Sequence, residues 1–455
     1  MHLVMDENST SQEEHHISGH HHMRIHWKEF FKSPDDTLIK DTTLVEKGSL
    51  VGRIGLMLLE CGTGAWRVRD SMNTISRALD ITCSADIGLL TISYTCFDVD
   101  NKSYSQTLSL PSTGVNMNKL NKLEDFVRRF ETENEYWTIG GIHHELNQIE
   151  RHTQTYPIAI SALSAGIACA SFIFLLGGGL PEMICTFFGA VIGNYLREYM
   201  GKKKITLVAK IAAGVAVSCA VYFLCFKLGQ LCFGWSYSHA YGYIGAMLYV
   251  IPGFPFITSG LDMSKLDMRS GLERLAYAIL TILIATMVGW GMATALSLKP
   301  GSIPELQLNP LALTIFRLIA SFSGVYGFSI MFNAKPSMAA VAAIIGAFSN
   351  TLRLNLVEFN HLPAALAAFI GALIAGLIAS FVRDKVGFPR IAITVPAIVI
   401  MVPGLYMYRA VFNFGVTNIN IGAYWIMNAL MIINALPIGL LTARILTDPK
   451  WRHAD

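Results

Sequence analysis

Val250-Ile251-Pro252-Gly253 and Met401-Val402-Pro403-Gly404 are two versions of one short motif, each set in an apolar segment. Residues 194–197 (Asn-Tyr-Leu-Arg) and 350–353 (Asn-Thr-Leu-Arg) form a second repeated motif, which precedes the first in both copies at nearly equal spacing. Polar and helix-breaking residues rarely recur in the same order by chance within apolar sequence. The two motifs therefore predict an internal duplication of the chain.

The composition of the chain predicts a membrane protein. Of its 455 residues, 53% are hydrophobic and only 15% are charged, and the mean hydropathy is +0.45. This leaves too little polar surface for a soluble globule of such length. A net charge of +3 is too small to indicate nucleic-acid binding. The eight cysteines follow neither a CxxC metal pattern nor the spacing of a secreted disulfide framework.

The distribution of polar residues divides the chain into four regions. Residues 1–45 are polar and histidine-rich, and we expect a disordered tail with no signal peptide and no metal-binding role. Residues 46–155 are predicted to form a cytosolic α+β domain. Residues 156–300 and 301–455 are predicted to be two transmembrane halves of five helices each.

The pattern of apolar residues predicts the elements of the cytosolic domain. From Val51 to Leu79 they recur every three or four positions, which predicts one long amphipathic helix. Residues 87–97 and 104–110 alternate, which predicts two strands of a hairpin. Further helices are predicted around 120–130 and 139–155. Two roles stay open for this domain, ligand sensing and oligomerisation, so a homo-oligomer is one possible state of the chain.

From Pro157 onward, ten apolar segments are long enough to cross the hydrocarbon core, which requires about 20 residues. Their predicted limits are 157–176, 181–199, 205–226, 240–261, 272–297, 310–332, 336–352, 363–382, 391–409 and 421–446. Placing the α+β domain in the cytosol puts most of the Lys and Arg residues between spans on that same side, as the positive-inside rule demands. Both termini are then cytosolic.

Five spans in each half is an odd number, so the two copies must enter the membrane from opposite faces. The predicted fold class is therefore a polytopic α-helical membrane protein with ten transmembrane helices in an inverted 5+5 repeat, preceded by a small cytosolic α+β domain. Inverted repeats of this kind are frequent in secondary transporters.

Each Pro-Gly pair is predicted to break a transmembrane helix. Proline lacks an N–H and clashes with the carbonyl four residues earlier, so Pro252 is expected to free the carbonyl of Leu248. Pro403 is expected to free that of Val399. A broken helix offers carbonyls at one end and N–H groups with a positive dipole at the other, which suits a zwitterion such as an amino acid. A packing kink without a ligand is the alternative.

We therefore predict a substrate pathway at the two breaks. Its candidate residues are those of the breaks and their neighbours in the chain: Pro252, Gly253, Pro255, Pro403, Gly404 and Tyr406. Pro255 is expected to add a second break in the first copy. The second copy has no such proline, and tyrosines follow its break instead.

Three polar residues within or next to the spans complete the predicted site. Asn194 and Asn350 both donate and accept hydrogen bonds, which suits a hydroxyl or carboxylate ligand; the alternative is that they hold helices together. Asp262 follows the first break and is the candidate for proton coupling, because ionisable groups in spans are functional by default. A permanently ionised Asp262 at the interface is the alternative.

Motifs for catalysis and for cofactors are missing from the sequence. His144-Glu145 lacks the second histidine that a zinc-protease helix requires, since Gln148 stands in its place. No GxxxxGK[ST] loop is present to hold a nucleotide. We therefore predict no enzymatic activity, no metal site and no cofactor.

Three sequence features resemble the threonine/serine exporter family of bacterial inner-membrane proteins. They are the segment 55–63 followed by Trp66-Arg67-Val68, the span that contains Ile251-Pro252-Gly253, and its echo Val402-Pro403-Gly404. The similarity extends from about Leu50 to Arg444. Family members usually have Arg-Val-Glu in their first helix, whereas residues 67–70 here read Arg-Val-Arg-Asp, so no role is transferred to that acid.

The resemblance implies a secondary active transporter in the bacterial inner membrane that exports threonine and serine from the cytosol, driven by the proton gradient. A small-molecule substrate, protons and the lipid bilayer are then the expected partners. Some members of the family are linked to small dicarboxylates such as succinate, so a dicarboxylate exporter is the first alternative. A channel or sensor without coupled transport is an alternative of another class.

Overall fold

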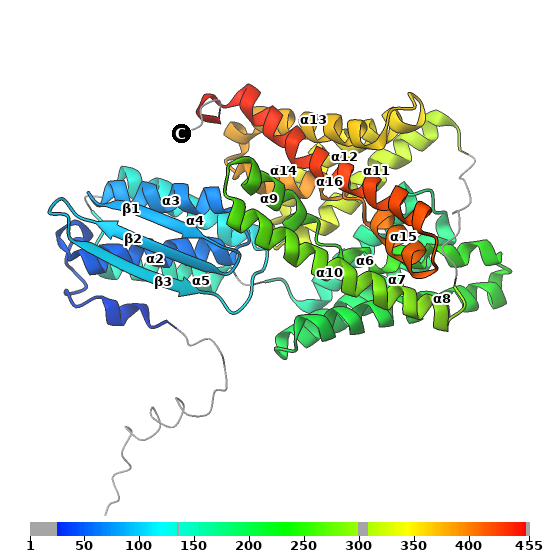
Figure 1. Cartoon of the computed structure of the whole chain (residues 1–455), viewed down its shortest axis with the longest axis horizontal. Helices are drawn as coiled ribbons and strands as arrows, with labels where there is room; N and C mark the ends of the chain where they lie inside the picture. Colours follow the sequence, from blue (N-terminus) through cyan, green and yellow to red (C-terminus); the bar gives the residue numbers. More distant parts are fainter. Residues whose placement is uncertain (1–24, 134–135, 154, 299–307, 452–455) are drawn as a thin grey trace, which may run out of the picture.

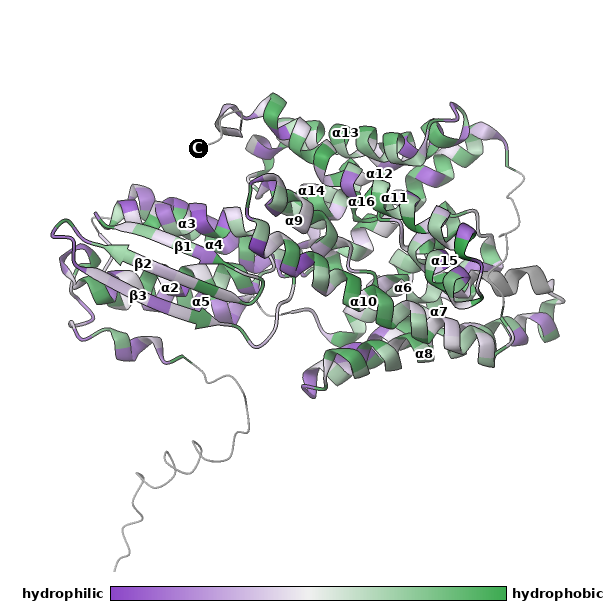
Figure 2. Ribbon diagram, viewed as in Figure 1, coloured by the Kyte–Doolittle hydropathy of each residue, from purple (hydrophilic) through white to green (hydrophobic). Residues whose placement is uncertain are grey.

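A computed structural model describes residues 25–133, 136–153, 155–298 and 308–451. Figure 1 shows two parts, an N-terminal region that contains a sheet and a larger bundle made of helices. Hydrophilic residues are frequent in the N-terminal region, and hydrophobic residues dominate the bundle (Figure 2). The histidine cluster at positions 15 to 22 lies outside the described residues.

The N-terminal region is built in layers on a three-stranded antiparallel sheet. Its strands are β1 (Thr82–Ile87), β2 (Thr91–Phe97) and β3 (Ser103–Ser109), in that order across the sheet. Its helices are α2 (Leu44–Glu60), α3 (Ala65–Ala78), α4 (Met117–Thr132) and α5 (Ile139–His152). Helices α2 and α3 contact the strands, and α4 packs on both helices. Buried and more exposed residues alternate along β2, so only one face of the sheet is covered.

The predicted hairpin is confirmed by β2 and β3, but β1 was not predicted. Residues 82–86 read Thr-Cys-Ser-Ala-Asp and offer little apolar alternation to detect. The single long helix predicted from Val51 to Leu79 is wrong, because α2 ends at Glu60 and α3 begins at Ala65. Gly62 lies between them at a φ of +79°, which favours glycine, and a Cβ there would lie 2.4 Å from the Gly114 carbonyl oxygen.

Part of the segment predicted to be a disordered tail is folded. Residues Trp27–Phe30 and Ile39–Asp41 form 3-10 turns, and Ile39 is fully buried. Glu46 in α2 fastens this segment, because its carboxylate accepts hydrogen bonds from the N–H groups of Lys32 (2.9 Å) and Ser33 (2.8 Å). The same carboxylate closes a capping box with Thr43 at the start of α2.

These hydrogen bonds predict a pH dependence of stability. Burial by itself raises the pKa of Glu46, but the hydrogen bonds from Ser33 and Thr43 outweigh it and lower the pKa from 4.5 to about 2. The unfolded state therefore binds the proton first, so the stabilisation is complete above pH 4.5 and is lost as the pH falls towards 2. Near-UV circular dichroism of the full chain should show this loss, and the Glu46→Gln variant should lack it. An equal loss in the variant would contradict the assignment to Glu46.

The helical bundle follows from α6 onward, and most of its elements coincide with the predicted spans. They are α6 (Ile158–Leu175), α7 (Leu180–Lys202), α8 (Leu207–Phe233), η3 (Tyr237–Val250), α9 (Gly253–Ser264), α10 (Met268–Ala295), α11 (Pro310–Met331), α12 (Pro336–Glu358), α13 (Ala364–Val386), α14 (Arg390–Val399), α15 (Gly404–Gly415) and α16 (Ile419–Thr447).

The described residues contain seven helices that are long and apolar enough to cross a membrane, or up to nine if each of two bent pairs is one span. The chain is therefore a multi-pass helical protein. Helix α7 corresponds to the predicted span 181–199 and is not among these nine, so the count of ten stays a prediction. The bent pairs are η3 with α9 (56°) and α14 with α15 (48°), and each bend falls at a Pro-Gly motif.

The two halves use their elements in the same order. Helices α6, α7 and α8 pack in succession in the first half, as α11, α12 and α13 do in the second, and α6 packs against α11. A bent pair and one long helix complete each half, α10 in the first and α16 in the second. This shared order supports the predicted duplication, and the inverted orientation stays a prediction.

Candidate functional site

The two helix breaks have the same backbone geometry. Pro252 has φ −80° and ψ 60°, and Pro403 has φ −82° and ψ 57°. The N–H of Gly253 donates to the Ile251 carbonyl at 2.8 Å, and that of Gly404 donates to the Val402 carbonyl at 2.9 Å. Both prolines therefore sit at the centre of an inverse γ-turn. Two breaks that match so closely are what a duplicated motif should produce.

The carbonyls expected to be free at the breaks are in fact bonded. The N–H of Ile251 donates to the Leu248 carbonyl at 3.1 Å, and the N–H of Val402 donates to the Val399 carbonyl at 3.1 Å. Element η3 is a 3-10 helix throughout, and α14 changes to a 3-10 bond at its end. In both cases the donor three residues on satisfies the carbonyl that the proline cannot reach. The prolines thus deprive these two carbonyls of their ordinary helical donors, and Ile251 and Val402 supply the partners in their place.

The second break expected at Pro255 does not occur. Helix α9 is continuous from Gly253 to Ser264, and Pro255 is its third residue. A proline in the first turn of a helix needs no hydrogen-bond acceptor, so it leaves the helix intact. Pro255 changes only the number of N–H groups at the start of α9. Helix α15 has Tyr406 at the same position and therefore has one N–H group more.

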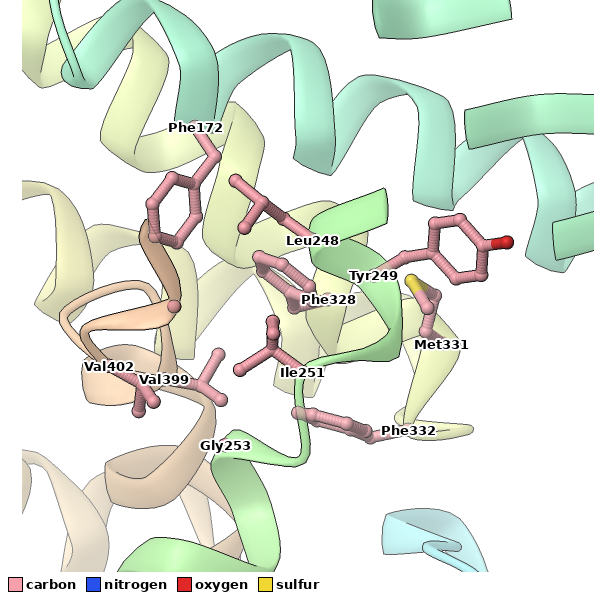
Figure 3. A pocket seen from close by; sticks show the side chains of 11 residues that line it. Phe172, Leu248, Tyr249, Ile251, Gly253, Phe328, Met331, Phe332, Val399 and Val402 are labelled. Carbon is pink, nitrogen blue, oxygen red and sulfur yellow. The ribbon is translucent and has the colours of Figure 1, made fainter. Parts of the chain in front are cut away.

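The two breaks meet at one cavity, although their sequences lie far apart. The cavity has a volume of about 30 Å³. Residues at both breaks line it, together with residues of α6 and of the end of α11. The lining residues are Phe172, Leu248, Tyr249, Ile251, Gly253, Phe328, Met331, Phe332, Val399, Val402 and Gly404 (Figure 3). Side chains of the two breaks point toward each other across it, while the Tyr249 hydroxyl points away. The two copies of the motif thus form one candidate site.

The glycines of the breaks are in close contact with the opposite copy. A Cβ on Gly253 would lie 2.5 Å from Val399 Cγ2, and a Cβ on Gly404 would lie 3.0 Å from Ile251 Cγ1. The cavity offers room for about one or two waters, since one water needs at least about 10–15 Å³. No charged side chain is among its lining residues. Its polar groups are those of the backbone, among them the N–H groups of Gly253 and Gly404, which donate within their own γ-turns.

Asn194 and Asn350 lie in equivalent positions but outside this cavity. Both are buried; Asn194 Nδ2 donates to Ser161 Oγ at 3.4 Å, and Asn350 Nδ2 donates to Ser321 Oγ at 2.9 Å. The first bond joins α7 to α6 and the second joins α12 to α11. These contacts favour the alternative that the asparagines hold helices together.

Two arginines near the breaks were not predicted as site residues. Arg353 on α12 donates to the Met401 carbonyl at 3.2 Å, just before the second break. Arg197 on α7 lies over the ring of Tyr249, just before the first break, with its Cζ 5.4 Å from the ring centre. Each arginine is the last residue of the repeated Asn-x-Leu-Arg motif, which was the signal available in the sequence.

The tyrosines that follow the second break lie outside the cavity as well. The Tyr406 ring packs edge-on against Trp425 of α16, with ring centres 5.1 Å apart. The Tyr408 hydroxyl lies 2.6 Å from the Tyr243 hydroxyl, and this buried contact joins α15 to η3. Tyr408 therefore links the two halves beside the site.

Asp262 lies at a buried joint between the bundle and the N-terminal region. Its Oδ2 is 3.1 Å from Arg274 Nε and accepts a hydrogen bond from Ser270 Oγ at 2.9 Å. Its Oδ1 accepts a hydrogen bond from the Ala65 N–H at 3.0 Å, at the start of α3. The arginine and the two further donors favour the charged carboxylate, whereas its burial, at 2% exposure, opposes the charge. Proton coupling and a permanently ionised Asp262 therefore both stay open.

Arg274 completes this joint. Its Nη1 donates to the Gly62 carbonyl at 3.1 Å and its Nη2 to the Thr63 carbonyl at 2.6 Å. The ion pair therefore holds the turn between α2 and α3 against α9 and α10. Within the described residues, no group of three His, Cys, Asp or Glu side chains is placed to hold a metal ion.

The spans and the bent helices define a polytopic helical membrane protein in which two matching helix breaks meet at one cavity. The profile of the family described as "Putative threonine/serine exporter" matches residues 49–297, and that of "Threonine/Serine exporter, ThrE" matches residues 317–446. The chain belongs to the threonine/serine exporter family, which confirms the resemblance found in the sequence.

The names of two individual relatives refer to succinate and not to threonine or serine. The chain is 26% identical over 240 residues to the "Probable succinate transporter subunit YjjP" of Escherichia coli (strain K12), which covers 52% of this chain and 90% of the relative. It is 25% identical over 239 residues to the protein of the same name from Klebsiella aerogenes, covering 52% of this chain and 89% of the relative. No solved structure matches the chain.

Proposed function

We propose that this chain is a secondary active transporter that exports threonine and serine from the cytosol in exchange for protons. The observation that carries the proposal is the meeting of two helix breaks of equal geometry at one cavity. Secondary transporters bind their substrates at such interrupted helices within the bilayer. The first-turn N–H groups of α15 suit the substrate carboxylate, and the Ile251 carbonyl, with a second lone pair, suits its ammonium group.

The cavity must widen before a substrate can enter it. A volume of about 30 Å³ is too small for an amino acid, and Gly253 and Gly404 are packed against the opposite break. We propose that export proceeds by a relative movement of the two bent pairs, which opens the cavity to one side of the membrane at a time. The structure then corresponds to a closed state of the site.

Asp262 is the proposed point at which a proton acts. Protonation of Asp262 would remove the negative charge that pairs with Arg274. It would also weaken the hydrogen bond from the Ala65 N–H to the Asp262 carboxylate, which connects α3 to α9. Because α9 begins at the first break, release of its other end would let it move. The proton gradient would thereby drive the movement of α9. The charge in the cavity that binds the substrate would stay the same.

Export of a small dicarboxylate is the second candidate. No acidic side chain lines the cavity, so an ammonium group would find only carbonyl oxygens there. Arg353, in contrast, lies beside the second break and suits a second carboxylate, whereas Arg197 beside the first break pairs with Glu198. The names of the Escherichia coli and Klebsiella aerogenes relatives point the same way.

For the setting of the protein we propose the bacterial inner membrane, with the N-terminal region and both termini in the cytosol. The clusters of Lys and Arg between spans support this orientation. Assembly into a homo-oligomer is compatible with the exposed N-terminal region, and size-exclusion chromatography with light scattering would establish the number of chains.

Efflux from proteoliposomes tests the proposed function. Vesicles loaded with labelled threonine, or separately with succinate, should release their content faster when a proton gradient is imposed. Release of threonine supports the first candidate, and release of succinate alone supports the second. In Asp262→Asn, release should continue but no longer respond to the gradient. Equal release with and without a gradient by the wild type would contradict coupled transport and indicate a channel.

A further inference from the structure

A second cavity lies between the N-terminal region and the bundle. It has a volume of about 50 Å³, and its walls come from α3, α9, α14 and α16. Charged and aromatic residues form much of the lining, notably Trp66, Arg67, Asp262, Arg390, Arg444 and Trp451. Apart from Asp262, none of them has a part in the function proposed above.

Two cations beside this cavity are fixed by tryptophan rings. The Arg444 Cζ lies 3.7 Å from the centre of the Trp451 ring and 4.7 Å from that of Trp66. The Lys265 Nζ lies 4.1 Å from the centre of the Trp451 ring. Asp448 is the nearest acid to Arg444, at 3.8 Å. Stacking on the rings keeps both positive groups in place, and Asp448 supplies Arg444 with an ion-pair partner on one side.

Arg390 is a buried cation whose hydrogen-bond partners are neutral. It is only 7% exposed; its Nη1 donates to Thr447 Oγ1 at 3.2 Å and its Nη2 to the Gly376 carbonyl at 3.2 Å. Among the described residues, no carboxylate lies within ion-pair distance of its guanidinium. Asp448 acts on this charge only from beyond ion-pair distance. Because a buried charge without a close counter-charge is costly, an anion in the adjoining cavity would stabilise Arg390.

The backbone adds to the attraction for an anion. Arg390 is the first residue of α14, and Ile391 and Thr394 of the same first turns line the cavity. The start of a helix carries free N–H groups and the positive end of the helix dipole, both of which favour a negative ligand. The acids near the cavity are already engaged, Glu124 by Arg67 and Asp262 by Arg274.

The second cavity is connected to the helix breaks by two half-helices. Helix α9 begins at Gly253 beside the first cavity and reaches Asp262 beside the second. Helix α14 runs the other way, from Arg390 to Val399, and the two helices contact each other. Ten residues of helix span about 15 Å, so the two cavities lie at opposite ends of this short helix pair.

We infer that the second cavity is the cytosol-side binding site for the carboxylate group of the exported substrate. Arg390, the start of α14 and Arg444 hold the carboxylate there before it passes along α9 and α14 to the helix breaks. This inference rests on the proposed transport function and names the residues that first recognise the substrate. Threonine, serine and succinate all carry the required group.

Binding and transport are to be measured on the full chain. Trp66 and Trp451 adjoin the cavity, so threonine, succinate and inorganic phosphate are titrated separately while tryptophan fluorescence is followed. Arg390→Gln should weaken substrate binding about tenfold, the loss of one charge-assisted contact. In proteoliposomes, the same variant should raise the half-saturating substrate concentration about tenfold and change the maximal rate little.

Two further variants separate binding from folding. Arg390→Lys keeps the positive charge and should recover part of the affinity, which a purely structural arginine would not show. Arg317→Gln is the matched control, because Arg317 is buried to a similar degree, at 8% exposure, but pairs with Glu358 on α12. It should leave the fluorescence titration unchanged.

The outcomes distinguish this inference from the proposed function. Saturable substrate binding that Arg390→Gln weakens supports the site, even if no substrate is exported and the transport function fails. Unchanged binding and unchanged half-saturation in Arg390→Gln, with export intact, overturn the site alone. A response to phosphate only, or one that needs anionic lipid such as phosphatidylglycerol in the vesicles, also overturns it and assigns the cavity to a phosphate group.

Discussion

Export is expected to fall about 100-fold or more when Pro252 and Pro403 are both replaced by alanine. Alanine restores an N–H at each position and removes the ring that clashes with the preceding turn, so each bent pair can continue as one straighter helix. The bends of 56° and 48° would relax, and the two breaks would no longer face one cavity. Misplacing groups at a binding site by about 1 Å is enough to cost about 100-fold in rate.

The measurement is gradient-driven efflux from proteoliposomes, with protein amount and thermal stability determined for each variant. Pro255→Ala is the matched control, since Pro255 lies only three residues from Pro252 but in the first turn of α9. It should retain at least about half of the wild-type rate, because the turn at Pro252 keeps its geometry. Wild-type efflux by the double variant would show that the breaks are packing kinks without a transport role.

Sequence reasoning located the breaks because proline and glycine act on the local backbone. The transporter hypothesis also assigned both breaks to one substrate pathway. The lining of the cavity could not be predicted, since Phe172 and Phe328 lie in uniformly apolar helices where no period separates one face from another. The hydrogen-bond partner of the Leu248 carbonyl could not be predicted either, because the formation of a 3-10 bond depends on how the helix end is packed.

Asp262 shows the same limit for ionisable residues. Its place after the first break made it a candidate for proton coupling, but its partners lie in two other segments of the chain, α10 and the start of α3. Arg274 is on α10, and Ala65 follows a helix break that the apolar periodicity concealed. A sequence shows that a charge is present in a membrane region, whereas the counter-charge depends on tertiary contacts. Arg390 was overlooked for the opposite reason, since it was counted only as a positive residue of a loop.

The joint at Asp262 links the N-terminal region to the half-helix α9. The side chains of Asp262 and Arg274 are 2% and 3% exposed, and between them they contact residues 62–65 of the N-terminal region. If α9 moves, either these contacts break or the N-terminal region moves with the helix. This coupling gives a physical reason for the two parts to be joined in one chain.

Arg274→Ala is expected to destabilise the protein by about 3–5 kcal/mol, because it leaves Asp262 buried and without its counter-charge. It also removes both donors to the Gly62 and Thr63 carbonyls, so protease cleavage in the turn between α2 and α3 should accelerate. Equilibrium unfolding in mixed detergent micelles measures the first effect, and limited proteolysis under native conditions measures the second.

Arg269→Ala is the control on the same helix, because Arg269 pairs with Asp86 but is half exposed. Exposed ion pairs contribute at most about 1 kcal/mol, so this variant should remain near the wild type. In the double variant Asp262→Ala with Arg274→Ala, the loss should be smaller than the sum of the two single losses, because no charge is left unpaired. Additive losses would mean that the two residues act separately, and the ion pair would then not be the contact that holds α9 to the N-terminal region.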